Sequence, residues 1–478
     1  MKRIDLLPDD VLLKIFDLYL IMNLPLYRGK FKKDIEAWQS LVHVCRRWRS
    51  LLFGSPLRLN LKLYCTPKTR AKDIKDVWPA LPLIIVDILA LSSSNITAAL
   101  GQSNRVHEVD LRIRSWQLEE VLASMQVPFP ELTDLQLWSY GETPPVIPDS
   151  FLGGSAPRLR FLTLHSIPFP GLPKLLLSAT RIVDLCLYGI PHSGYFSPQA
   201  IVDPLSVLSN LETLHLEFQS PQSHPNLETQ SQPSPKRSIL PVLAKFRFYG
   251  VTEYLEQLVA RIETPQLNQM EINFFYQIDF DCARLARFIN CTPRFRALEE
   301  AHVELNDSTA SITLGSRVPK LLSGYLLIDI SCREPNMQLS FIEQICNSCF
   351  YPLSAVEDLY IDHRYLIWMN EAIEDRLWLQ LLLPFTAVKN LFLSKDIAPG
   401  IADALQGLVG DKITEVLPSL RNIFVNWLEQ SGSFQETIGQ FVAARHLSGF
   451  NHPIAISNIS ANSNPCSTTS TSIIMFQV

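Results

Sequence analysis

Three short patterns combine residue types that could do chemistry. The first is a CxxC pair, Cys346 and Cys349, with Cys332 upstream. Such pairs occur in zinc sites, but here no second CxxC and no close histidine pair completes a tetrahedral ligand set. The surrounding sequence, LSFIEQICNSC, predicts a helix that places the two thiols at i and i+3, beside Ile342. Buried free thiols are therefore the favoured interpretation.

The other two patterns are the paired glycines of FLGGSAP and the adjacent His192 and Ser193 of HSGYFSP. The glycine pair lacks the lysine and the spacing of a phosphate-binding loop, so it indicates a turn. Adjacent residues say nothing about a catalytic triad, which is assembled in space. The ten histidines show no metal-type spacing. The sequence thus predicts a protein without enzymatic activity, metal or cofactor.

A fourth pattern, VCRRWRSLLFGSP, places three arginines around Trp48, a combination that could bind nucleic acid. The chain's net charge of −5 provides no global basic field for a phosphate backbone. Helical periodicity instead groups Trp48 with Val44, Leu51 and Leu52 on one face. We therefore expect a buried tryptophan, a solvated rim of arginines and no nucleic-acid partner.

The composition bounds the class of protein. Its 478 residues are 47% hydrophobic and 19% charged, which is enough apolar material for a large core. The nine cysteines are odd in number and widely spaced, which is unlike a secreted disulfide framework. No signal-peptide pattern and no apolar stretch of about 18 to 20 residues is present. The prediction is a soluble intracellular protein, cytoplasmic or nuclear, with no membrane contact.

The first fifty-odd residues predict three short helices. LLPDDVLLKIFDLYL opens with a proline and two acids, which suit the first turn of a helix. A second helix is expected over Ile35 to Val44, and a third over Arg46 to Phe53, ending near Gly54 and Pro56. So small a unit buries little surface alone. We expect a partner or the next domain to complete it.

The order of these apolar pieces, LP…V…IF…L…VC-R-W-R-L over roughly residues 4 to 56, resembles the F-box. The resemblance implies docking to a Skp-type adaptor, and through it to a cullin, in an SCF-type ubiquitin ligase. The stretch between the first two helices is longer than the F-box pattern, which leaves adaptor affinity open. The alternative is an ordinary intramolecular helical core. The implied adaptor contacts are Leu7, Pro8, Val11, Ile15, Leu41, Val44 and Trp48.

A repeat fills the remaining chain. The pattern Ω-x-x-Ω-x-Ω, with Ω apolar, recurs at intervals of 23 to 32 residues. Its last three positions alternate with period two and predict a short strand, and helical patterns fill several intervals. Such units resemble leucine-rich repeats and imply an α/β solenoid with parallel strands on the concave face and helices and loops outside. A doubly wound domain would hold fewer strands. The copies begin at Val106, Leu132, Leu159, Ile182, Leu211, Leu243, Leu267, Leu298, Tyr325, Val356, Val388 and Leu420.

Three phrases within the repeats, FLGGSAPRLRFLTL, IPFPGLPKLLLSAT and IPHSGYFSP, resemble a fungal F-box family. The predicted organisation follows: an F-box over residues 1–56, a linker and solenoid cap over 57–105, and a leucine-rich-repeat-like domain over 106–445. The Ser-, Pro- and Gln-rich segment 219–238 predicts a mobile loop within that domain, and the polar segment 446–478 a disordered tail.

A substrate would meet the residues that alternate with the buried ones on each strand. Among thirty-six such positions, three for each of the twelve copies, eleven are acidic and three basic. This indicates an acidic groove with aromatic anchors for a basic protein segment, although a solvated face without a ligand fits the pattern equally well. The predicted function is substrate recognition for an SCF-type ligase; the alternatives are a scaffold outside ubiquitin transfer and, least favoured, an enzyme. The candidate substrate contacts are Trp138, Phe161, Tyr188, Tyr249, Glu271, Glu304, Asp358, Tyr360 and Asp362.

Overall fold

The computed structural model forms two compact units, Met1–Phe196 and Ser197–Val478. Most of the segment 219–238 and of the tail 446–478 lies outside the residues that the structure describes. Those residues are 7–22, 37–56, 58–66, 71, 81–87, 93–141, 143–221, 237–276, 282–315, 324–349, 351–363, 373–408, 412–426, 432–447, 454–459 and 472–474.

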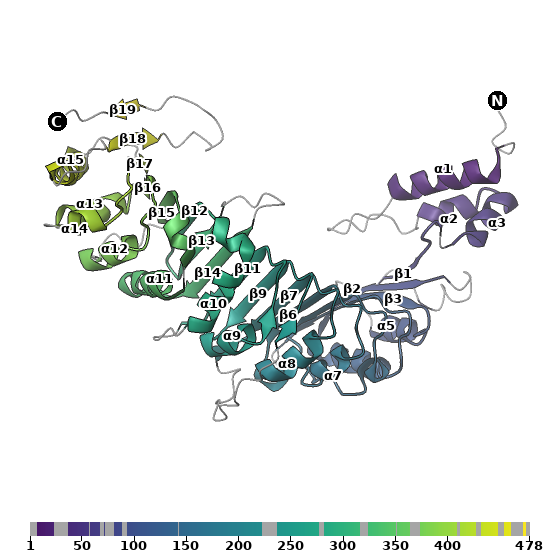
Figure 1. The fold of residues 1–478 in the computed structure, drawn as a ribbon. Helices are drawn as coiled ribbons and strands as arrows, with labels where there is room; N and C mark the ends of the chain where they lie inside the picture. The colour runs from purple at the N-terminus through teal and green to yellow at the C-terminus, as the bar shows by residue number, and fades with distance from the viewer. Residues whose placement is uncertain are drawn as a thin grey trace. The chain divides into compact units, whose positions relative to one another are not determined.

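Unit 1 begins with three helices, α1 (Asp9–Met22), α2 (Ala37–Val42) and α3 (Arg46–Gly54) (Figure 1). Phe16 of α1 is fully buried and meets Trp48 of α3 edge to face, with ring centroids 4.8 Å apart. Cys45 caps α3, because its sulfur accepts a hydrogen bond from the Trp48 backbone N–H. The second helix is shorter than predicted within the described residues, since its last residue is Val42.

Arg47 links α3 to the start of α1 through an ion pair and a hydrogen bond. Its Nη2 atom lies 2.5 Å from Asp9 Oδ1 and donates a hydrogen bond of 2.6 Å to the Leu7 carbonyl. Arg49 donates from Nε to the Val42 carbonyl at 3.1 Å. Arg49 is exposed, as the predicted solvated rim requires, and the Val42 carbonyl that it reaches is at the C-terminal end of α2, where carbonyls lack a partner within the helix. The prediction is wrong for Arg47, which is half-buried because it contacts the start of α1.

The rest of unit 1 is a parallel sheet that runs in chain order from β1 to β6. Helices and 3-10 turns lie along one side of it (Figure 1). The strands are β1 (Leu63–Cys65), β2 (Leu83–Asp87), β3 (Val106–Arg114), β4 (Asp134–Tyr140), β5 (Phe161–His165) and β6 (Asp184–Ile190). The helical elements are α5 (Ser93–Leu100), α6 (Ser115–Ser124), η2 (Phe151–Gly154), α7 (Leu172–Leu176) and η3 (His192–Gly194).

The predicted turn at FLGGSAP is confirmed as η2. Gly153 has a φ of +67°, and a Cβ atom there would lie 2.8 Å from Pro128 Cγ. Only glycine tolerates both this left-handed backbone and this close approach. The glycine pair therefore serves backbone geometry between two repeats.

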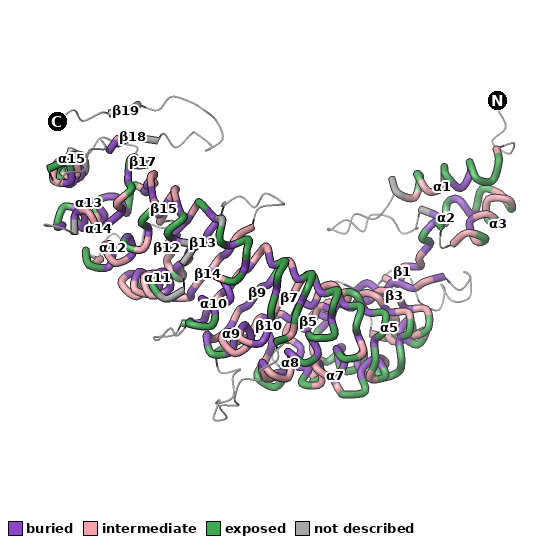
Figure 2. Tube along the Cα trace, in the orientation of Figure 1, coloured by how far each residue is buried: buried purple, intermediate pink, exposed green. Residues whose placement is uncertain are grey.

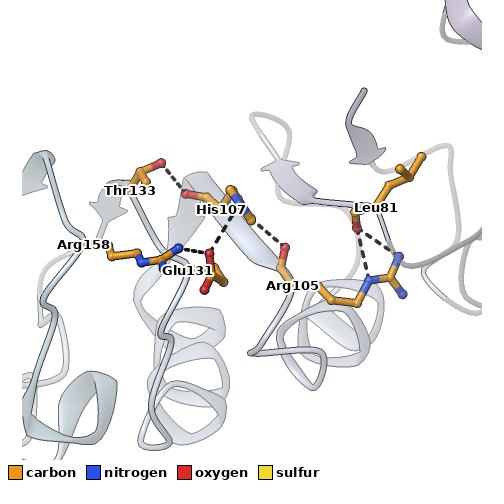
Figure 3. Close-up of polar contacts among 6 residues, drawn as sticks. All are labelled: Leu81, Arg105, His107, Glu131, Thr133 and Arg158. Carbon is orange, nitrogen blue, oxygen red and sulfur yellow. Dashed lines mark hydrogen bonds and ion pairs between the residues drawn. The ribbon is translucent and has the colours of Figure 1, made fainter. Parts of the chain in front are cut away.

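Polar contacts join consecutive repeats at the edge where the unit 1 strands begin (Figure 3). Arg105 donates from Nε and Nη2 to the Leu81 carbonyl, both at 3.1 Å. Thr133 donates from Oγ1 to the His107 carbonyl at 3.1 Å, and Arg158 pairs with Glu131. Each contact reaches one repeat back along the chain, so together they help to fix the register of neighbouring strands.

Unit 2 continues the same design with strands on one side and helices on the other (Figure 1). Its strands are β7 (Thr213–Phe218), β9 (Lys245–Gly250), β11 (Gln269–Phe274), β12 (Glu300–Leu305), β13 (Thr309–Leu314), β14 (Tyr325–Ser331), β15 (Asp358–His363), β16 (Asn390–Ser394), β17 (Asn422–Asn426), β18 (Ala455–Ile459) and β19 (Ser472–Ile474), with a separate pair β8 (Ser238–Ile239) and β10 (Ile262–Glu263). Its helical elements are α8 (Pro198–Leu205), α9 (Thr252–Val259), α10 (Ala283–Cys291), η5 (Pro293–Ala297), α11 (Pro335–Cys349), η6 (Tyr351–Ala355), α12 (Asp375–Leu382), α13 (Ala398–Gln406), α14 (Lys412–Glu415) and α15 (Gly432–Leu447).

All twelve copies of the repeat pattern form strands, as predicted, but one inversion breaks their order. β11 pairs with β14, and β12 pairs with β15, both in parallel. Between them lies β13, antiparallel to both β12 and β14. The spatial order is therefore β11, β14, β13, β12, β15. A short meander replaces one parallel crossover at this place.

The tail differs from its predicted disorder where it is described. β18 pairs in parallel with β17, and β19 pairs antiparallel with β18. Ile456 of β18 is buried. The polar composition of the tail concealed this short apolar segment, which extends the unit 2 sheet.

Burial alternates along the strands as the period of two requires (Figure 2). In β5, Leu162 is buried on the helix side and Thr163 is half-buried on the opposite side. We call this opposite side of each sheet the open face. The core of each unit therefore lies between strands and helices, as in other layered α/β folds.

Replacing Leu162 by alanine should lower the free energy of unfolding by about 2–5 kcal/mol, because it leaves a cavity between sheet and helices. Thr163→Ala on the same strand should cost about 1 kcal/mol or less. Urea unfolding followed by circular dichroism measures both. Equal losses would contradict the assigned faces.

Candidate functional site: an apolar helix stripe and the open sheet faces

Helix α1 carries apolar side chains on two faces. Leu12 and Phe16 point into the helical unit and are at most 1% exposed. Val11, Ile15 and Leu18 follow the spacing i, i+4 and i+7, and are 42%, 44% and 53% exposed. The internal core therefore leaves this outward stripe uncovered, and a row of apolar residues at that spacing suits contact with a partner.

The predicted adaptor contacts divide by exposure. Pro8, Val11, Ile15 and Val44 are exposed, whereas Leu41 is buried. Leu7 and Trp48 are half-buried, and the Trp48 ring packs on Phe16. A partner could contact the exposed members without any change in the helices, whereas Leu41 packs inside the helical unit.

The open faces carry side chains in rows, because neighbouring strands pair in register about 4.8 Å apart. In unit 2 one row contains four carboxylates, and we call it the carboxylate row: Glu217, Asp329, Glu304 and Asp362. Tyr249 and Asn273 separate Glu217 from Asp329, and Ser311 separates Asp329 from Glu304. Glu304 and Asp362 are direct register partners on β12 and β15.

Aromatic side chains stack in a second row of unit 2. His302 and Tyr360 have ring centroids 4.4 Å apart, and Tyr360 and Phe392 lie 4.2 Å apart at an interplanar angle of 7°. Phe424 continues the stack at 4.6 Å. The strand spacing is close to the stacking distance of aromatic rings, so the sheet itself brings these side chains together.

Unit 1 carries a similar stack at its own open face. The Arg112 guanidinium lies 4.9 Å from the centroid of the Trp138 ring, and Trp138 stacks on His165 at 4.5 Å. Tyr188 completes the row, 6.0 Å from His165. Trp138 and His165 are nearly parallel, with an interplanar angle of 15°, whereas the Tyr188 ring is tilted by 31° from His165. The proposed aromatic anchors are thus shared stacks rather than isolated side chains.

Burial raises the pKa of several open-face groups, and neighbouring carboxylates add to the effect. Burial, together with Glu108 and Asp110 nearby, raises the pKa of Asp134 to about 6. Burial and the neighbouring Glu304 raise the pKa of Asp329 to about 7. Burial, followed by Asp358 and another carboxylate, raises the pKa of Tyr360 to about 12. These open-face acids therefore hold protons unusually well, because ionised neighbours and low solvation oppose their charge.

The structure brings some predicted substrate contacts together and separates others. Trp138 and Tyr188 share the unit 1 stack, and Tyr249 and Glu271 line one hollow of unit 2. Asp358 accepts a hydrogen bond of 2.6 Å from the Asn390 amide. Phe161 lies in another row, in register with Asp134 and Asp184.

Sequence reasoning left His302 and Arg112 out of the candidate contacts, although each ends a stack. The pattern of alternation places both on the open face, among the thirty-six positions counted above. Their stacking partners become visible only when strands are paired. The omission of Asp329 has the same origin, since its crowding depends on β13 standing between it and Glu304.

The cysteine prediction concerns α11. Cys346 is fully buried, and burial raises the pKa of its thiol well above the usual range. Cys332 is also buried. The Cys349 side chain lies outside the described residues. Across the described part of the chain, no cluster of three or more His, Cys, Asp or Glu side chains could hold a metal ion.

Among the helices of the described ranges, none has both the length and the apolar character needed to cross a bilayer.

No protein-family model matches the chain, and the search of curated proteins found no match. One similar solved structure is a leucine-rich repeat-containing protein, LegL7 of Legionella pneumophila, at 14% identity and a TM-score of 0.26, covering 80% of this chain and 97% of that one. Another is the TLR13–ssRNA13 complex, at 12% identity and a TM-score of 0.28, covering 79% of this chain and 47% of that one.

The unit 2 stack should show energetic coupling. In a double-mutant cycle with Tyr360→Leu and Phe392→Leu, we expect a coupling of about 0.5–1.5 kcal/mol in unfolding free energy, beyond the area that each ring buries. Thermal and urea unfolding of the four proteins measure it. Strict additivity would contradict the stacking.

Asp134 should make stability depend on pH. Its native pKa of about 6 exceeds its value of about 3.9 in an unfolded chain, so the native state holds more protons between these values. Stability should therefore fall as pH rises from about 4 to about 6. Asp134→Asn should lose this part of the dependence, so that its stability relative to the wild type increases over the interval. Urea unfolding at several pH values checks this, and parallel profiles would contradict it.

Proposed function

We propose that this protein is a substrate-recognition subunit of an SCF-type ubiquitin ligase. In this proposal the helices α1 to α3 act as an F-box that docks on a Skp-type adaptor. The adaptor connects it to a cullin, and the repeat sheets receive a protein substrate. The protein performs no chemistry itself; it acts by holding the substrate near a separate ubiquitin-conjugating enzyme.

One observation carries the proposal: the outward stripe of Val11, Ile15 and Leu18 remains exposed although the helical unit has its own filled core. Phe16 and Leu52 are fully buried without any help from the stripe. An ordinary intramolecular helical core would not need apolar residues on this outer side. A protein partner would cover them at a gain of about 25 cal/mol per Å² of apolar surface.

The open faces support a protein substrate rather than a nucleic acid. Eleven acids against three bases repel a phosphate backbone, whose binding depends on neutralisation by lysine and arginine. Stacked aromatic side chains add rigid contact area, which loses little conformational entropy on binding.

A scaffold that binds the adaptor outside ubiquitin transfer is the second candidate, since it uses the same stripe. The two candidates differ in the proteins that co-purify with them. A ligase subunit co-purifies with both adaptor and cullin, whereas a scaffold co-purifies with the adaptor alone.

Ile15→Glu and Val44→Glu should each abolish capture of a purified Skp-type adaptor, because a charge replaces an exposed apolar contact. Both residues are exposed, so the helical fold should survive, which circular dichroism can verify. Leu177→Glu, at a residue 54% exposed in another part of unit 1, is the matched control and should bind normally. Capture unchanged by the first two variants, or no capture by the wild type, would refute the F-box assignment.

A further inference from the structure

A hollow of about 230 Å³ lies on the open face of unit 2, over β7, β9, β11 and β14. Its polar lining includes Glu217, Tyr249, Asn273 and Asp329, and Phe248 contributes apolar lining. Pockets for drug-sized ligands measure about 300–1,000 Å³, and one water takes about 30 Å³ of liquid volume. The hollow is therefore of a size for one long side chain.

The carboxylates around this hollow differ in their partners. Glu271 pairs with Arg247, whose Nε lies 2.7 Å from Oε2, and it also accepts a hydrogen bond from Tyr325. Glu217 lies 3.4 Å from Nε2 of His215. Asp329 has a buried Oδ1 atom that accepts no hydrogen bond from the described residues. It is thus the acceptor in the hollow that a bound cation can satisfy.

The electrostatic environment of Asp329 points the same way. Its pKa of about 7 reflects burial first and the charge of Glu304 second, against a hydrogen bond from the Ile330 backbone. The groups around it in the row, Asn273 and Ser311, carry no charge. An incoming cation would lower this pKa, because an opposite charge favours the ionised carboxylate.

The carboxylate row has a spacing that an extended peptide can match. Asp329 on β14 and Asp362 on β15 are three strand steps apart through β13 and β12. At about 4.8 Å per step this is roughly 14 Å, and four residues of extended chain also span roughly 14 Å. Glu217 on β7 lies three steps from Asp329 in the other direction, through β9 and β11. Residues i and i+4 of an extended strand point to the same side.

We propose that the carboxylate row binds an extended basic segment of a protein, with one lysine or arginine seated in the hollow on Asp329. The next basic residue, four positions along, meets Asp362 with Glu304 beside it. A third, four positions the other way, meets Glu217. The inference rests on the proposed function only in naming the segment as part of the substrate.

The test measures binding of fluorescein-labelled glycine–serine peptides to the full chain by anisotropy. One peptide carries two arginines at i and i+4, a second has them adjacent, and a third has citrulline in their places. The i, i+4 peptide should bind most tightly, and the citrulline peptide should not bind. Asp329→Asn and Asp362→Asn should each weaken the i, i+4 peptide about tenfold, as loss of a charge-assisted contact does.

Asp403→Asn is the matched control, because it removes the same charge from an exposed residue of α13, on the helix side. It should change affinity by about twofold or less. Equal effects of Asp403→Asn and Asp329→Asn, equal binding of the two arginine peptides, or binding of the citrulline peptide would overturn the proposal. Circular dichroism confirms that each variant is folded.

Calorimetry gives an independent readout. Near pH 7 the free Asp329 is partly protonated, so binding of the arginine peptide should release protons, seen as a dependence of the heat on buffer ionisation. Glu217, Glu271, Glu304, His215 and Arg247 also face this region and remain in Asp329→Asn, which should lose most of the release. Equal release by the variant would contradict the role of Asp329. No adaptor is present in these assays, so their failure leaves the adaptor capture result independent.

Discussion

In-register pairing of short strands is the constraint on which the rest of this structure depends. Each strand buries every second side chain against the helices, and the paired backbone fixes the neighbouring strand at the same level. The remaining side chains therefore lie at the same level on neighbouring strands. They form rows across the open face, which is why like residues on successive repeats become stacks of rings or runs of carboxylates.

Some rows of side chains on the open face stabilise the fold, and others bring like charges close together. Rings at one level gain by stacking, as Tyr360 does between His302 and Phe392. Amides at one level form a hydrogen-bonded chain, since Asn422 donates to Asn390, which donates to Asp358. Carboxylates at one level repel, and this repulsion adds to burial, the larger cause, in raising the pKa values of Asp134 and Asp329. A positively charged partner would relieve the repulsion among these carboxylates, so charge complementarity would favour its binding.

Much of this arrangement could be predicted from the sequence. The period of two located all twelve strands of the repeat and separated buried from open-face residues, because burial imposes that period directly. Strand neighbours carry no such signal. The sequence therefore does not predict that β13 pairs antiparallel with both β12 and β14. For this reason the neighbours of Asp329 on the open face could not be predicted either. The pairing of Arg47 with Asp9 was hidden for the same reason, since the two residues are distant in the chain.

The N-terminal helices and the open sheet faces each leave a surface that the chain itself does not cover. On α1 that surface is the exposed apolar stripe of Val11, Ile15 and Leu18, and on unit 2 it is the carboxylate row, whose members are half-buried. The two surfaces differ in chemistry, and in the proposed function each would receive a different partner, one apolar and one basic. This is the property that a substrate receptor requires.

Hydrogen–deuterium exchange of the full chain, with and without a purified Skp-type adaptor, tests this account most directly. The account predicts slower exchange in α1 and at the start of α3 when the adaptor is present, with the open-face strands β11 to β15 unchanged. Unchanged exchange in α1 and α3 under saturating adaptor, or protection confined to the open-face strands, would contradict it.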